Sequence, residues 1–185
     1  SVSLKTKKAA HRAAFLFLCV AFCTALEVQA SEVQALEYAV KAAYLYNFAK
    51  FVEWPPQAFT DNASPIVIGV LGENPFGGVL EATVQNQILN SRPIVIKQSR
   101  NVEDLKTCQL LFVSQSEQRS VREVLNQLRG ASVLTVSDME SFVQNGGIIR
   151  FVKMENKIRF EINQEAAKEA NLKISSKLLS LAVRP

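Results

Sequence analysis

The sequence predicts an α/β domain of three layers, in which a mostly parallel sheet carries helices on both faces and ends in an antiparallel hairpin. Short apolar runs rich in β-branched residues alternate with segments of helical periodicity along the 185 residues. This alternation is typical of parallel strands joined by right-handed crossovers. Near the C-terminus, two apolar runs follow each other across a short polar link at Glu155. Such a link is too short for a crossover, so these runs are expected to form a hairpin at one sheet edge.

Residues 1–30 have the three-part layout of a secretory signal peptide. A basic start precedes an uncharged apolar stretch, Ala13–Leu26, and Val28-Gln29-Ala30 then places small residues where a signal peptidase reads. The apolar stretch is about 14 residues long, shorter than the roughly 20 residues of a transmembrane helix. An uncleaved membrane anchor is the alternative. We therefore expect export to the periplasm, removal of residues 1–30, and a single domain over residues 31–185.

Removal of the first 30 residues takes away most of the charge imbalance and the only histidine. Of 21 basic and 17 acidic side chains, four and one lie in that segment, which leaves 17 against 16, a balance of +1. No nucleic-acid partner is therefore expected. His11 also leaves, which excludes catalytic pairs and zinc sites that need histidine. Cys108 remains as the only thiol and is expected to be buried; a bridge between two molecules is the alternative.

The first segment of the domain, Glu32–Val52, has the periodicity of an amphipathic helix. Pro55 and Pro56 end this helix, because proline lacks the backbone N–H and disfavours helical geometry in the residue before it. An unpaired amide is costly on an apolar face, so we expect Asn47 to bond to backbone. The apolar stripe is expected to contain Leu36, Val40, Ala43, Asn47 and Phe51, with Tyr44 and Phe48 beside it.

Four apolar runs in the middle of the chain are expected to be strands, with helices between them. The glycine-containing stretch that follows the first strand lacks the dinucleotide and phosphate-loop patterns, so we expect a structural turn there, with a small-anion site as the alternative. The strands are Ile66–Leu71, Ile94–Ile96, Leu110–Ser114 and Ser132–Val136. The helices are Pro75–Val84 with Asn74 as N-cap, a short one at Val102–Leu105, and Glu117–Leu128 with Gly130 as its stop.

The last part of the chain is expected to begin with a short helix from Ser137 to Asn145. The hairpin follows, with strands at Ile148–Val152 and Ile158–Ile162. A helix at Asn163–Ala170, an extended segment at Leu172–Ile174 and a helix at Ser175–Ala182 complete the predicted elements.

Six residues are predicted to bind a partner. Arg150, Arg159, Glu161 and Asn163 place polar groups on the hairpin, and Phe51 and Trp54 form a second contact at the end of the first helix. Arginine is favoured at interfaces for its planar set of donors, and edge strands also offer unpaired backbone. The alternatives are a solvated hairpin face whose charges only stabilise the hairpin, and a Trp54 that packs a helix terminus. No catalytic residue, metal ligand or cofactor is predicted, because no spacing forces two carboxylates together.

The run from Tyr38 to Pro55 resembles the opening of the YfiR/HmsC-like family of periplasmic proteins. A second segment that is specific for this family is the run Arg159-Phe160-Glu161-Ile162-Asn163. Cys108, followed by the apolar run at 111–113, also fits, so the resemblance spans nearly the whole mature chain. Further matching segments are 68–72, 74–77, 92–94, 134–138, 146–149 and 174–179.

This resemblance implies a regulator rather than an enzyme. Family members of this kind bind the periplasmic sensing domain of an inner-membrane GGDEF diguanylate cyclase and restrain it, which lowers cyclic di-GMP and biofilm formation. In the best-known arrangement an OmpA-like outer-membrane lipoprotein sequesters the repressor. This chain departs from that repressor in one respect, because it has a single mature cysteine where the repressor has disulfides. Control of its activity by redox state is therefore in doubt. A homodimer stays open, and a small-solute binding module that serves a transporter or sensor kinase is the alternative function.

Overall fold

The computed structural model describes residues 31–183, so the predicted signal peptide lies outside the described residues. Helical geometry covers residues 31–51. The chain divides into two compact units between residues 37 and 38, and the sheet belongs to the second unit, which begins at Tyr38. Within the described residues, no helix combines the length and the apolar character that a membrane span needs.

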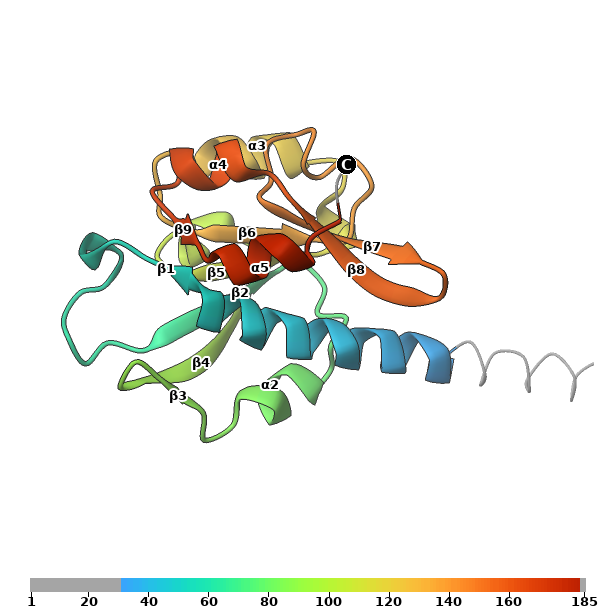
Figure 1. The fold of residues 1–185 in the computed structure, drawn as a ribbon, viewed down its shortest axis with the longest axis horizontal. Helices are drawn as coiled ribbons and strands as arrows, with labels where there is room; N and C mark the ends of the chain where they lie inside the picture. The colour runs from blue at the N-terminus through green and yellow to red at the C-terminus, as the bar shows by residue number, and fades with distance from the viewer. Residues whose placement is uncertain (1–30, 184–185) are drawn as a thin grey trace, which may run out of the picture. The chain divides into compact units, whose positions relative to one another are not determined.

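A seven-stranded sheet organises the second unit, in the order β3-β4-β2-β5-β6-β7-β8. The strands from β4 to β7 in this order run parallel, whereas β3 and β8 lie antiparallel at the two edges. This arrangement confirms the predicted mostly parallel α/β sheet with a late hairpin (Figure 1). The strands are β2 (Ile66–Leu71), β3 (Ile88–Leu89), β4 (Arg92–Ser99), β5 (Leu110–Val113), β6 (Leu134–Ser137), β7 (Ile149–Met154) and β8 (Lys157–Ile162).

Helices cover both faces of the sheet and enclose two apolar cores. One core contains Phe48, Phe112 and Phe160 and lies under the first helix, α2, α4 and α5, while the other contains Leu111 and Phe142 and lies under α3 and η2. Strand residues alternate between the two cores because successive side chains point to opposite faces. The helices are α2 (Val79–Val84), α3 (Val121–Gln127), α4 (Gln164–Glu169), α5 (Ser176–Leu181) and the single turns η1 (Pro56–Ala58), η2 (Val102–Leu105) and η3 (Gln115–Glu117).

A second, two-stranded sheet joins the end of the first helix to the C-terminal part of the chain. It pairs β1 (Val52–Glu53) with β9 (Lys173–Ile174) in antiparallel register. The backbone N–H of Ser175 continues this pairing by donating to the carbonyl of Phe51 at 2.9 Å. The predicted end of the first helix before Pro55 and the predicted extended segment near Ile174 therefore meet each other.

The first helix buries a different stripe from the one predicted. Val40 is 40% exposed, and Ala43 and Asn47 are exposed as well, so Asn47 is not a buried amide. The two stripes are neighbours on the helix and both have helical spacing, but the buried one contains Lys41, whose charge argues against burial. The buried side chains are Tyr38, Lys41, Ala42, Leu45, Phe48, Ala49 and Val52.

Three predicted helices differ from the structure, and the one predicted at Glu117–Leu128 begins only at Val121. α2 begins at Val79 rather than Pro75, because Gly77 has φ +57° and interrupts helical geometry, while Asn74 accepts a turn hydrogen bond from Phe76 N. Turns replace the helix predicted from Ser137 to Asn145. Here Ser137 is the last residue of β6, and its hydroxyl donates to the carbonyl of Val113 at 2.7 Å. The same hydroxyl accepts from the backbone N–H of Met139 at 3.2 Å, so short-range side-chain bonds of Asn74 and Ser137 stabilise turns in place of helices.

Cys108 is buried as predicted, and burial raises the pKa of its thiol to about 12. We expect iodoacetamide to leave the native protein unmodified at neutral pH and to label it fully in denaturant, because only the thiolate is nucleophilic. Reductant should leave the melting temperature unchanged. The pKa of the Cys108 thiol is higher in the folded protein than in the unfolded chain. The free energy of unfolding should therefore fall as the pH rises above about 9, where the thiol of the unfolded chain loses its proton. Fast iodoacetamide labelling of the native protein, measured by mass spectrometry, would contradict a buried thiol.

Candidate partner-binding site

The β7–β8 hairpin carries four of the six predicted contact residues. β7 pairs with β6 only through Ile149 and Arg150, so the rest of the hairpin continues beyond the carboxyl end of β6. Figure 1 shows it extending away from the sheet toward its turn. Alternation gives it two faces, an inner face built on Phe151 and Phe160 and an outer face. The hairpin outer face consists of Arg150, Val152, Met154, Lys157, Arg159 and Glu161.

Aromatic packing on the inner face attaches the hairpin to the first helix. The ring of Phe48 lies 5.0 Å from that of Phe160 and 5.7 Å from that of Phe151. Tyr44 contacts the same two rings, and its hydroxyl donates to the carbonyl of Ile158 at 3.3 Å. Edge-to-face and offset aromatic pairs contribute about 0.5–1.5 kcal/mol each beyond their buried area. The hairpin is therefore held against the helix and presents its outer face in a fixed position.

Arg150 and Glu161 form an ion pair across the hairpin. Nε of Arg150 lies 2.7 Å from Oε1 of Glu161, and Glu161 is only 4% exposed. The contact is not an aligned hydrogen bond, because within residues 31–183 neither atom has a hydrogen-bond partner. Arg150 also donates to the carbonyl of Glu140, in the loop between β6 and β7. These two predicted contact residues thus hold the hairpin to its own loop.

Arg159 has different surroundings from Arg150. It lies opposite Val152 and is exposed, and its guanidinium makes no hydrogen bond or ion pair within the described residues. Lys157 on the same face is exposed, and Met154 is 50% exposed. The outer end of this face therefore combines two cations with a large apolar side chain, a composition that suits an acidic partner surface.

Asn163 has a structural position after the hairpin. Its Oδ1 accepts from the backbone N–H of Ala166 at 3.0 Å and caps α4. Its Nδ2 donates to the carbonyl of Val143 at 3.3 Å. A helix cap of this kind contributes about 1 kcal/mol of stability. The predicted helix start at Asn163 is confirmed, and both ends of the amide are already used within the protein.

The outer edge of β8 is partly closed. The carbonyl of Phe160 accepts from the backbone N–H of Val183 at 2.9 Å, and that of Ile158 accepts from Tyr44. A partner strand would need these carbonyls to extend the sheet. The predicted role of unpaired edge backbone is therefore weakened, and side chains are the groups that the hairpin can offer.

Phe51 and Trp54 lie away from the hairpin outer face. The indole N–H of Trp54 donates to the carbonyl of Gln109 at 2.8 Å, just before the amino end of β5. The hairpin instead continues past the carboxyl end of β6, which runs parallel to β5. The Phe51 ring lies below the ammonium of Lys177 at 5.2 Å. The structure brings these two aromatic residues to one end of the sheet and the hairpin to the other.

A buried charge pair at the carboxyl ends of the strands was not predicted. Nζ of Lys41 lies 2.6 Å from Oδ2 of Asp138, with side chains only 4% and 9% exposed. The Tyr38 hydroxyl donates to the same oxygen at 2.9 Å, and Gln115 donates to Oδ1 at 3.1 Å. We call these four residues the Lys41 cluster. A signal was present in the sequence, since Lys41 interrupts an otherwise apolar helical stripe.

The crevice between the carboxyl ends of β2 and β5 is filled by the chain itself. On one side of this crevice the chain continues from β2 to β4, and on the other side it continues from β5 to β6. In open α/β sheets, the position where the strand order reverses in this way is the usual ligand site. Here the hydroxyl of Ser116 accepts from the backbone N–H of Glu73 at 3.0 Å. A Cβ atom at Gly72, which has φ +88°, would lie 2.3 Å from that hydroxyl oxygen. The glycine-containing stretch after β2 is therefore a tightly packed turn.

Within residues 31–183, no three histidine, cysteine, aspartate or glutamate side chains gather closely enough to hold an ion.

Comparison with known proteins identifies the family. Residues 38–183 match the YfiR/HmsC-like family. No curated protein matches the chain. Among solved structures, a conserved domain protein from Vibrio cholerae O1 biovar El Tor is similar at 12% identity and a TM-score of 0.47; the match covers 64% of this chain and 54% of that one. This chain thus spans about half the length of that protein. Because the family match covers well over half of the sequence, this chain belongs to the YfiR/HmsC-like family.

Proposed function

We propose that this protein binds the periplasmic sensing domain of an inner-membrane GGDEF diguanylate cyclase and inhibits it, which lowers cyclic di-GMP and biofilm formation. The observation that carries the proposal is the family match over residues 38–183. Membership supports a regulatory, non-catalytic protein of the periplasm that acts in the diguanylate cyclase system in general. Binding to the sensing domain, and export through cleavage after Ala30, are our more specific proposals.

The hairpin outer face is the surface that we propose for this contact. A regulator that acts by binding needs a rigid, exposed element, because ordering a flexible one costs affinity. Aromatic packing on the first helix supplies the rigidity, and Arg159 is exposed without a partner inside the described chain. Since Arg159 and Lys157 are both cations, the matching surface of the sensing domain is expected to be acidic.

The six predicted contact residues take separate roles in this proposal. Arg159 is the direct contact, whereas Arg150 and Glu161 hold the hairpin in position through their ion pair. Asn163 caps α4 and acts through the stability of the fold. Phe51 and Trp54 lie at the other end of the sheet, so they are proposed as a separate surface, suited to a second partner such as an OmpA-like lipoprotein that sequesters the regulator.

Deletion of the gene from the native host is expected to raise cyclic di-GMP and surface attachment. Wild-type protein supplied from a plasmid should restore both. Arg159→Ala should restore them poorly, because loss of an interface arginine typically weakens binding by about 1–3 kcal/mol, roughly tenfold to hundredfold. The readouts are cyclic di-GMP by mass spectrometry, and the affinity of the purified protein for the purified sensing domain by calorimetry.

Arg100→Ala is the matched control, since Arg100 is also an exposed arginine and follows β4, at the opposite side of the sheet from the hairpin. It should restore repression fully. Thermal unfolding of both variants should match that of the parent, so that weak repression by Arg159→Ala reports binding. Cyclic di-GMP levels that do not change on deletion, under several growth conditions, would contradict the proposed inhibition of a cyclase.

A further inference from the structure

A cavity opens where the sheet is incomplete. β6 pairs with β7 only through Val136 and Ser137, so the first half of β6 has no strand beside it on that side. α4 and the end of α3 border this gap, and between them lies a cavity of about 400 Å³. Its volume falls within the usual range for small-molecule sites, roughly 300–1,000 Å³. The cavity does not overlap the hairpin outer face or the Lys41 cluster.

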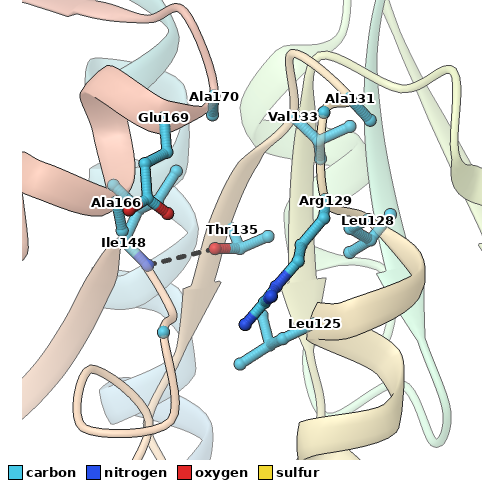
Figure 2. A pocket seen from close by; sticks show the side chains of 12 residues that line it. Leu125, Leu128, Arg129, Ala131, Val133, Thr135, Ile148, Ala166, Glu169 and Ala170 are labelled. Carbon is cyan, nitrogen blue, oxygen red and sulfur yellow. Dashed lines mark hydrogen bonds between the residues drawn. The ribbon is translucent and has the colours of Figure 1, made fainter.

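Apolar side chains form part of the cavity walls. Leu125, Leu128 and Val133 line one side, and Ile148 and Ala166 line the other (Figure 2). Ala166 in α4 has a small side chain, which leaves room that a larger residue would occupy. This lining suits a compact aliphatic group of a ligand, which gains about 25 cal/mol for each Å² of apolar surface removed from water.

Two opposite charges face the cavity from opposite walls. Arg129 reaches in from the segment after α3, and Glu169 from the last residue of α4 (Figure 2). Neither side chain makes a hydrogen bond or ion pair within residues 31–183. Both are exposed, so each can reorient toward a ligand. A ligand that carries both a negative and a positive group can pair with both walls at once.

A buried hydroxyl adds a polar group at the floor. Thr135 is 4% exposed and lines the cavity, and its Oγ1 accepts from the backbone N–H of Ile148 at 3.0 Å. With that acceptor bond made, the hydroxyl hydrogen remains to donate to a ligand oxygen. A few fixed polar groups around an apolar lining are what orients a small ligand in a protein pocket.

We propose that this cavity binds a small zwitterion with an aliphatic side chain, an α-amino acid of the size of leucine. The carboxylate pairs with Arg129, the ammonium pairs with Glu169, and the side chain packs on Leu125 and Ile148. This proposal goes beyond the inhibition of a cyclase and does not depend on it, because the cavity residues are separate from Arg159. A molecule with only one of the two charges would leave the other wall unpaired.

The experiment is calorimetric titration of the purified protein with L-leucine, 4-methylpentanoate and 3-methylbutylamine at neutral pH. The last two probes keep the aliphatic group but lack the ammonium and the carboxylate, respectively. L-leucine is expected to bind with saturation, and each single-charge probe at least about tenfold more weakly. Arg129→Gln and Glu169→Gln should each weaken leucine binding by about tenfold or more. Arg100→Gln is the control and should bind leucine like the parent.

A second variant tests the location independently of charge. Ala166→Leu adds three carbon atoms to the wall that faces Leu125, and should strongly weaken leucine binding while the protein still melts cooperatively. Absence of saturable leucine binding, a carboxylate that binds as tightly as leucine, or charge variants that bind like the parent would each overturn the proposal. Because no cyclase is present in this assay, its failure would leave the proposed inhibition untouched.

Discussion

Asp138→Asn is expected to destabilise the protein by about 2–3 kcal/mol, because it removes the buried carboxylate that pairs with the Lys41 ammonium and accepts from Tyr38 and Gln115. Lys41 is 3% exposed and its Nζ lies 2.6 Å from Oδ2 of Asp138, so water cannot replace the lost partner. The amide keeps the size of the carboxylate, which limits the change to charge and hydrogen bonding. For a domain of this length, such a loss lowers the melting temperature by roughly 5–10 °C, measurable by calorimetry or circular dichroism.

Two further variants separate a buried charge from a general loss of contacts. Glu165→Gln breaks the pair with Lys168, in which both side chains are more than two-thirds exposed, and should change stability by less than about 0.5 kcal/mol. Lys41→Met added to Asp138→Asn removes the buried ammonium together with the carboxylate and should recover part of the loss, since neutral replacements of a buried pair are tolerated better than removal of one of its charges. A double variant less stable than Asp138→Asn would contradict this explanation.

The strands and the hairpin could be predicted because their signals are local. Ile66–Leu71 and Leu110–Val113 are continuous apolar runs, as expected for strands covered on both faces, and both are central in the sheet. The short link at Glu155 required an antiparallel hairpin, and both Glu155 and Asn156 have positive φ, which suits a tight turn. The strand β3 was missed because two residues carry too little periodicity.

The phase of the first helix could not be predicted, because tertiary contacts decide it. A stripe through Val40 and Asn47 and a stripe through Lys41 and Phe48 both have helical spacing. The second is buried because Asp138, nearly 100 residues later, supplies a counter-charge for Lys41. The predicted helix after Ser137 failed for a related reason, since the residues around Asp138 form the turn that delivers this carboxylate.

The positions of the predicted contact residues could be predicted only in part, and their binding to a partner stays a prediction. Alternation placed Arg159 and Glu161 on one face of the hairpin correctly. Register decides that Arg150, not Arg159, lies opposite Glu161, and this was open until the pairing of β7 with β8 was known. The cavity beside Thr135 has no local signal, because it results from where β7 begins relative to β6.

Gly147→Ala is expected to be destabilising by about 2–3 kcal/mol or more through overpacking. A Cβ atom at this position would lie 2.3 Å from Cδ1 and Cε1 of Phe142, a ring that is fully buried under α3. The ring cannot move away easily, because the backbone N–H of Gly147 donates to the carbonyl of Phe142 and fixes the two residues together. Gly147 lies two residues before β7, so strain there should also shift the hairpin and weaken the proposed binding to the cyclase together with stability.

Two other glycines provide matched controls for this steric explanation. Gly78→Ala adds the same methyl group where nothing lies within 4 Å and φ is −88°, and it should leave stability unchanged or slightly raised. Gly146→Ala meets no atom either, but its φ of +100° should cost about 1 kcal/mol from the backbone alone. Phe142→Leu combined with Gly147→Ala should lose less stability than the two single changes added, because the smaller side chain removes the clash. Equal melting temperatures for Gly147→Ala and Gly78→Ala would rule out the close packing of Phe142 against this turn.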